Sequence, residues 1–98
     1  MGPLTGTKIV EFAGLGPGPF CGMVLADMGA EVIVIDRIEN YGKEKTNDLA
    51  SRGKKSIAID LKNPNSKELV NELVKNADAV LEGLRPGKME NLGLGPND

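Results

Sequence analysis

Four short apolar runs, separated by segments with helical periodicity, are the feature that most constrains the fold of this chain. They span residues 8–12, 31–36, 56–60 and 79–82. None alternates cleanly between apolar and polar side chains, which is typical of parallel strands covered on both faces. Strand–helix–strand units in series pair their strands in parallel, through right-handed crossovers. The pattern therefore predicts an α/β fold with an open, mostly parallel, Rossmann-like sheet and flanking helices.

Two helices are predicted between these strands. Residues 19–29 carry apolar side chains at helical spacing, and Gly29 suits the left-handed position that often follows a helix. The second helix is predicted to begin at residues 63–64, where Pro64 fits a first turn, and its apolar stripe continues to Ala77. Several side chains of these two helices are assigned to core packing: Met23, Val24, Met28, Leu69 and Leu73.

Residues 37–55 show little periodicity and are predicted to form a long loop. A loop of this length in a compact domain is more often functional than idle. We expect its Arg52, Lys54 and Lys55 to add positive charge to a nearby site. Residues 83–98 are rich in glycine and proline, with a short helix expected around residue 88. A chain of 98 residues has room for one domain, so a single α/β domain is predicted over its whole length.

The composition argues against several classes of function. The net charge is −2, so the chain lacks the basic character of many nucleic-acid-binding proteins. No apolar stretch approaches the roughly 18–20 residues of a membrane-spanning helix, and no signal peptide is recognisable. We therefore expect no nucleic-acid partner and no membrane partner. The expected location is cytoplasmic, or mitochondrial or peroxisomal in a eukaryote.

The chain contains no histidine and a single cysteine, and these counts limit its chemistry. Without histidine it has no Ser–His or Cys–His nucleophile pair and no His-based metal site, and one cysteine cannot build a zinc site. Cys21 is interpreted as a small buried apolar residue, because no base is available to activate its thiol. Any chemistry must use carboxylates, lysines or backbone groups, and no metal site is expected.

The segment AGLGPGPFCG, residues 13–22, has the outline of a dinucleotide-binding loop without its full pattern. That pattern is G-x-G-x-x-G, followed by an acidic residue about 20 positions on. Counted from Gly14 or from Gly16, the sixth position is not glycine. Pro17 and Pro19 have no N–H to donate to a pyrophosphate. The segment is therefore interpreted as a tight β–α turn and not as an NAD or FAD site.

Three of the four predicted strands are followed by a basic residue, namely Arg37, Lys62 and Arg85. Ligands of open parallel sheets bind outside the carboxyl ends of the strands, so these side chains would converge there. Converging cations suit a ligand with several phosphates, such as coenzyme A, ATP or a sugar nucleotide. The alternative is that each is a solvated loop charge with its own carboxylate partner. Glu11, at the end of the first strand, could also face this cleft.

Three blocks of the sequence resemble the CaiB–BaiF (class III) CoA-transferase family, in the order in which that family has them. The blocks are GPLTGTKIVEFAGLGPGPFCGMVLADMGAEVIVIDR, RGKKSIAIDLK and LEGLRPGKMENLGLGP, and they cover nearly the whole chain. The first block is closer to the α-methylacyl-CoA racemase branch than to the formyl- or carnitine-CoA transferase branch. The resemblance implies the N-terminal, CoA-binding α/β part of the family's fold.

The resemblance also implies a binding site and a reaction. The family's CoA site carries over onto Arg37, Ala58, Ile59, Asp60, Leu61, Lys62 and Arg85. Racemases of the family exchange the α-proton of an acyl-CoA thioester through a His and an Asp, and the transferases use an Asp nucleophile. Those residues lie beyond the equivalent of position 98. We therefore expect no catalytic residue in this chain, no activity from it alone, and no cofactor beyond the coenzyme A of an acyl-CoA substrate.

Members of this family are several times longer than this chain and form interlocked dimers. The chain is accordingly expected to be the N-terminal fragment of a 2-methylacyl-CoA racemase, an isomerase of fatty acid metabolism that is a homodimer at full length. One alternative is a CoA-transferase that moves coenzyme A between carboxylic acids. Another is a truncated module that binds coenzyme A or a nucleotide without catalysis.

Overall fold

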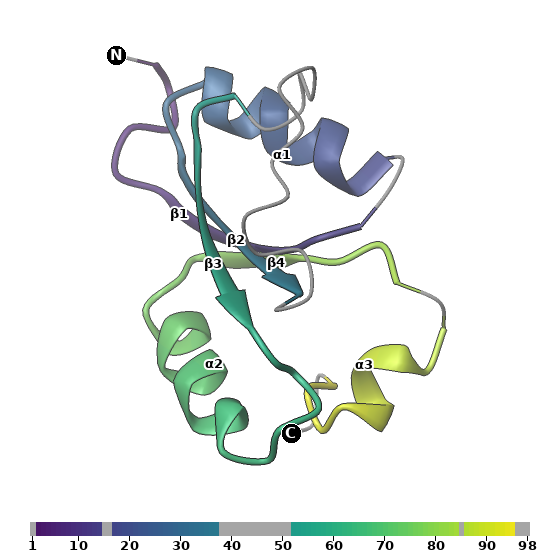
Figure 1. Ribbon diagram of the computed structural model, residues 1–98. Coiled ribbons are helices and arrows are strands. Elements are labelled where there is room, and N and C mark those ends of the chain that lie inside the picture. The colour runs from purple at the N-terminus through teal and green to yellow at the C-terminus, as the bar shows by residue number, and fades with distance from the viewer. Residues whose placement is uncertain (1, 15–16, 38–51, 85, 96–98) are drawn as a thin grey trace.

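The computed structural model describes residues 2–14, 17–37, 52–84 and 86–95, and these form a parallel sheet with helices on both sides (Figure 1). In chain order the elements are β1 (Lys8–Phe12), α1 (Pro17–Asp27), β2 (Glu31–Arg37), β3 (Lys54–Ile59), α2 (Ser66–Lys75), β4 (Ala79–Leu81) and α3 (Lys88–Asn91). The strand order is β3-β2-β1-β4, and every pairing is parallel. The predicted α/β fold with an open parallel sheet is thus confirmed.

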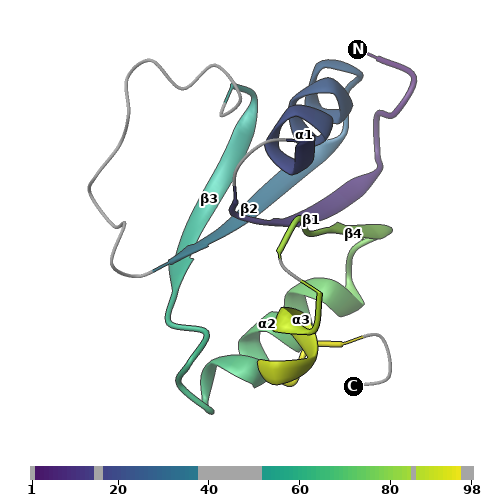
Figure 2. The ribbon, with the colours of Figure 1, turned by 90° about the vertical axis from the view of Figure 1, so that its right-hand side faces the viewer.

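The helices cover opposite faces of the sheet, with α1 on one face and α2 and α3 on the other (Figures 1 and 2). Alternate residues of a strand point to opposite faces, so each strand contributes to two separate cores. In β1, Val10 packs in a cluster with Val70 of α2 and Met89 of α3. Its neighbour Ile9 lies in the second cluster, against Leu25 of α1. The core of this small domain is therefore divided by the sheet.

The boundaries of the strands differ from the prediction at the segment expected to be a long loop. β2 continues through Arg37, and β3 begins at Lys54, so the loop prediction for residues 37–55 is wrong at both ends. Residues 38–51 lie outside the described part of the chain. The register explains the early start of β3, because Lys54 pairs with Val32 of β2. This edge strand begins with polar side chains, so a search for apolar runs does not detect its start.

The helices begin and end close to their predicted positions, with one clear shift. Gly29 adopts φ of +102°, the left-handed conformation expected after α1. α2 begins at Ser66 instead of residues 63–64. The reason is a turn stabilised by the Asn63 side chain, whose Oδ1 accepts a hydrogen bond of 2.9 Å from the backbone N–H of Asn65. The short helix expected around residue 88 is present as α3.

Some side chains assigned to the core are instead exposed. Met28 and Leu69 are 44% and 47% exposed, so their assignment to packing was wrong. Cys21 is also exposed, contrary to its interpretation as a buried residue. Met28 lies in the turn that follows α1, and in α2 it is Val70 that is buried, so the adjacent Leu69 stays open to solvent. None of the helices in the described ranges is long and apolar enough to cross a membrane.

We expect Val70→Ala to lower the free energy of unfolding by about 1–3 kcal/mol, because the Val70 side chain is fully buried and its truncation leaves a cavity. The neighbouring Leu69→Ala is the matched control and should change stability by no more than about 0.5 kcal/mol. Urea unfolding followed by circular dichroism measures both. Equal losses in the two variants would contradict the placement of Val70 in the core.

Candidate functional site

A cavity of about 190 Å³ lies at the carboxyl ends of the central strands. Its apolar lining comes from the ends of three adjacent strands, with Phe12 of β1, Ile35 of β2 and Ile59 of β3. Leu84, after β4, and Leu92, after α3, also line it. The parallel arrangement creates this position, because strand ends of one direction meet at one edge of the sheet. The cavity is therefore where the topology predicts a ligand site.

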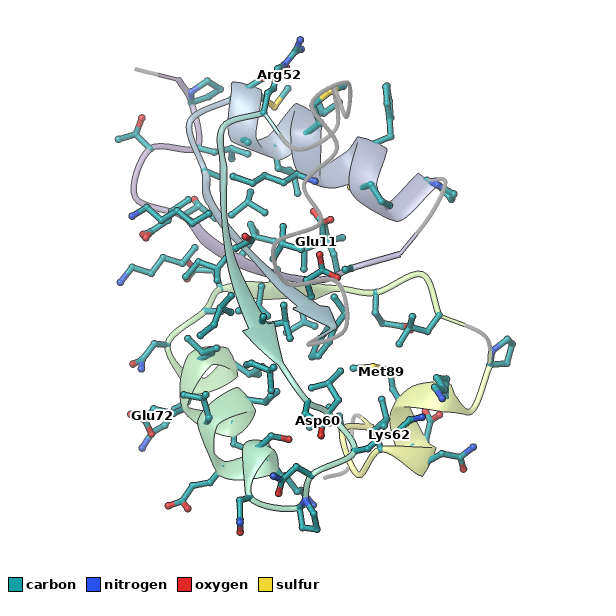
Figure 3. All side chains as sticks on the ribbon, in the orientation of Figure 1. Glu11, Arg52, Asp60, Lys62, Glu72 and Met89 are labelled. Atoms are coloured by element: carbon teal, nitrogen blue, oxygen red, sulfur yellow. The ribbon has the colours of Figure 1, made fainter. Side chains whose placement is uncertain are left out.

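Two lysines from different elements line the same cavity. Lys62 follows β3, and Lys88 is the first residue of α3. Both are exposed, and neither forms an ion pair within the residues that the structure describes. The turn carrying Lys62 is held by Asp60, whose Oδ1 accepts a hydrogen bond of 3.1 Å from the Lys62 backbone N–H. Figure 3 shows Asp60 and Lys62 at the end of β3, beside α3.

The predicted site residues are brought together only in part. A continuous run, Ile59 to Lys62, lines the cavity. Ala58 pairs with Asp36 in the β2–β3 ladder and is not among the lining residues. Arg37 is the last residue of β2, opposite Ile59, but its side chain lies outside the described part, as does the whole of Arg85. The predicted convergence of three strand-end cations therefore stays a prediction.

Lys88 is the lining cation that the sequence analysis missed. The predicted cations directly follow strands, whereas Lys88 enters from a short helix. One signal was available in the sequence. Lys88 and Leu92 are four residues apart in the predicted short helix, a spacing that places two side chains on one face. Both in fact line the cavity.

A second, more open cavity of about 500 Å³ adjoins the first. The two share Leu61, Lys62 and Leu92, and the second extends between the start of α2 and the turn after α3. Lys67 of α2 lies among its lining residues. Lys62 therefore stands between two hollows and is within reach of a ligand in either one.

The basic residues expected to contribute charge from the loop are instead engaged in ion pairs. Arg52 Nη2 lies 2.6 Å from Asp27 Oδ2, and Lys55 Nζ lies 3.2 Å from Glu31 Oε1. Lys54 is buried and paired with Glu11. None of the three lines either cavity, so the expectation that they strengthen the field of the site is wrong.

Glu11 does not face the cleft, which corrects the orientation considered for it from the sequence. Its side chain points to the α1 side of the sheet and is 3% exposed, in an ion pair with Lys54 (Figure 3). The alternation of β1 explains this, because Phe12, one residue further, faces the other side and lines the cavity. Within the described ranges, no group of three or more His, Cys, Asp or Glu side chains could hold a metal ion.

The fold and the site define the class as an α/β domain with a cavity at the carboxyl edge of a parallel sheet, and the sequence places this domain in a family. The model of CoA-transferase family III matches residues 4–98, and the chain belongs to that family. Among its relatives, the Alpha-methylacyl-CoA racemase of Mus musculus is 47% identical over 93 residues, which is 95% of this chain and 23% of the relative. The Succinyl-CoA–D-citramalate CoA-transferase of Chloroflexus aurantiacus is 40% identical over 105 residues, covering 95% of this chain and 26% of the relative.

Solved structures agree with this assignment. A hypothetical protein (Rv3272) of Mycobacterium tuberculosis superposes with a TM-score of 0.86 at 39% identity, over 100% of this chain and 29% of the other. A CAIB/BAIF family protein of Brucella suis gives 0.85 at 32% identity, over 98% and 29%. The resemblance to the CaiB–BaiF family is therefore confirmed. The chain spans about a quarter of the length of the curated relatives it matches.

The pair between Asp27 and Arg52 predicts a pH dependence of stability. Hydrogen bonds from the Arg52 guanidinium hold the pKa of Asp27 below its ordinary value, and the same contact raises the pKa of Arg52. A lowered carboxylate pKa stabilises the fold above the unfolded pKa, about 3.9. That contribution is lost as the pH falls through the lower pKa of the folded chain.

We therefore expect Asp27→Asn to reduce stability at neutral pH, with the difference from the parent chain shrinking as the pH drops below about 4. The effect is small, because both side chains are exposed. Urea titrations across this pH range measure it. A difference that stays constant with pH would show that the ion pair is not its source.

Proposed function

We propose that the cavity at the carboxyl edge of the sheet binds part of the coenzyme A of an acyl-CoA substrate. The observation that supports this is an apolar floor combined with Lys62 and Lys88, which form no ion pair in the described part of the chain. An apolar floor suits the flat adenine base, and lysine ammonium groups suit phosphates. The first cavity fits only a part of such a ligand, and the adjoining hollow leaves room for more. No cofactor beyond this coenzyme A is proposed.

We infer that the complete enzyme is a 2-methylacyl-CoA racemase and that this chain supplies its CoA-binding portion. The identity of 47% to the mouse racemase, against 40% to the citramalate CoA-transferase, favours this branch. Transfer of coenzyme A between carboxylic acids is the second candidate, because relatives of both kinds match the chain. Incubating the complete enzyme with an acyl-CoA and a second carboxylic acid separates the two. A new thioester identifies a transferase, and loss of chirality at C2 identifies a racemase.

We expect Lys62→Ala and Lys88→Ala each to weaken the binding of coenzyme A by about 2- to 5-fold, the value of an exposed charge pair. Arg37→Ala should weaken the binding as well in the complete enzyme, because a guanidinium group pairs well with phosphate oxygens. Isothermal titration calorimetry measures the dissociation constants, and added salt should reduce the differences by screening.

Lys75→Ala is the matched control for these variants, because it removes the same charge from the far end of α2. Its affinity should equal that of the parent chain. If all four variants bind coenzyme A as tightly as the parent chain, these cations do not belong to the site. Weaker binding in Lys75→Ala as well would show that the net charge of the chain, and not a local site, attracts coenzyme A.

We further expect no exchange of the α-proton by this chain alone, because it has no histidine to take part in the transfer. Deuterium incorporation at C2 of a 2-methylacyl-CoA in heavy water, followed by NMR, tests this. Incorporation above the uncatalysed rate would place the proton-transfer groups within these residues. The homodimer proposed for the complete enzyme can be tested separately by light scattering.

A further inference from the structure

A buried ion pair lies beneath α1, away from the proposed CoA cavity. Lys54 Nζ of β3 lies 2.8 Å from Glu11 Oε1 of β1, and the two side chains are only 4% and 3% exposed. β2 stands between these strands in the sheet, so the lysine reaches across it. Figure 3 shows Glu11 on the face of the sheet that α1 covers. The pair therefore connects strands that are not hydrogen-bonded to each other.

The same lysine also holds the start of α1. Its Nζ donates a hydrogen bond of 3.0 Å to the carbonyl oxygen of Pro19, in the first turn of the helix. One turn later, Gly22 is buried directly above the pair, and a Cβ at this position would collide with the Glu11 carboxylate. The missing side chain lets the helix approach the charges closely. Lys54 thus joins β1, β3 and α1 at one point.

Burial of this pair is hard to explain by stability alone. Taking two charges out of water costs several kcal/mol per ion, and apolar replacements of buried ion pairs are often neutral or stabilising. An ion pair is directional, whereas apolar packing is not. The two charges and the carbonyl must lie at fixed positions relative to one another. Glu11, Lys54 and Pro19 meet that requirement with α1 in its observed placement.

That placement matters for the cavity, because its walls begin next to these residues. Phe12 and Ala13, which follow Glu11 directly, both line it. On the other side, a Cβ at Gly18 of α1 would lie 3.8 Å from the backbone nitrogen of Gly83, beside the lining residue Leu84. The first turn of α1 thus lies next to the segment that carries the lining residue Leu84.

We propose that Glu11 and Lys54 are positioning residues that fix the first turn of α1 and, through it, the wall of the proposed CoA cavity at Leu84. The inference rests on the proposed function for its effect on affinity. Its effect on the position of α1 is independent of any ligand.

The test uses Cys21, the single cysteine of the chain, which is exposed in α1. A trifluoromethyl label on this thiol reports the environment of the helix by ¹⁹F NMR. The key variant is Glu11→Leu with Lys54→Met, which removes both charges and keeps the volume apolar. The matched control is Glu31→Leu with Lys55→Met, an exposed ion pair between neighbouring strands.

We expect the buried double variant to unfold at a urea concentration no lower than that of the parent chain. Its ¹⁹F signal should nevertheless shift or broaden, and its affinity for coenzyme A should fall by about 3- to 30-fold. The control should leave signal and affinity unchanged. A folded variant with the parent signal and affinity would overturn the proposal.

Should the double variant fail to fold, Glu11→Gln decides the question by the same two readouts, because it keeps the shape and removes the charge. An unchanged signal and affinity in that variant would again overturn the proposal. If the parent chain itself does not bind coenzyme A, the proposed function fails. The ¹⁹F signal then still decides whether the pair positions α1.

Discussion

The rest of this structure depends on the parallel pairing of β1 with both β2 and β4. Because β1 is hydrogen-bonded on two sides, three strand ends lie at one edge, and Phe12 and Ile35 come together there in the floor of a cavity. Parallel strands leave both faces to be covered, so a helix must pack on each. The chain meets this demand with two small cores in place of one. The position of the cavity at the strand ends is therefore a consequence of the topology.

Burial and ion pairing determine how much positive charge each basic residue of this domain presents near the cavity. Lys54 is enclosed with Glu11, while Arg52 and Lys55 meet carboxylates at the surface. These pairs cancel charge locally, so their fields decay quickly with distance. Lys62 and Lys88 retain their charge beside the cavity, exposed and without an ion-pair partner in the described ranges. In a chain with a net charge of −2, attraction of an anionic ligand would come from such local groups and not from the overall charge.

The fold was predictable because it depends on short apolar runs and on a general rule of chain handedness. The start of β3 was not, because Lys54 and Lys55 give an edge strand the composition of a loop. Within the site, Lys62 could be placed from the rule that ligands bind at carboxyl ends of parallel strands, and Ile59, Asp60 and Leu61 came from the family resemblance. Lys88 was not predicted, because its position depends on how α3 packs, and only its spacing from Leu92 indicated a shared helix face. The orientation of Glu11 was not predicted for a different reason. Its partner Lys54 is distant in sequence, and no local pattern indicates the ion pair.

The orientation of Glu11 also bears on how the sheet finds its register. In β1, one residue separates a carboxylate that faces α1 from Phe12, which faces the cavity floor. A slip of one residue would exchange these faces. The carboxylate would then lie among apolar side chains without Lys54, and a phenyl ring would meet the space kept open by Gly22. An unpaired buried charge costs far more than a misplaced apolar side chain. The ion pair therefore disfavours the slipped register more strongly than apolar alternation alone, and this links the precision of the strand pairing to the shape of the site.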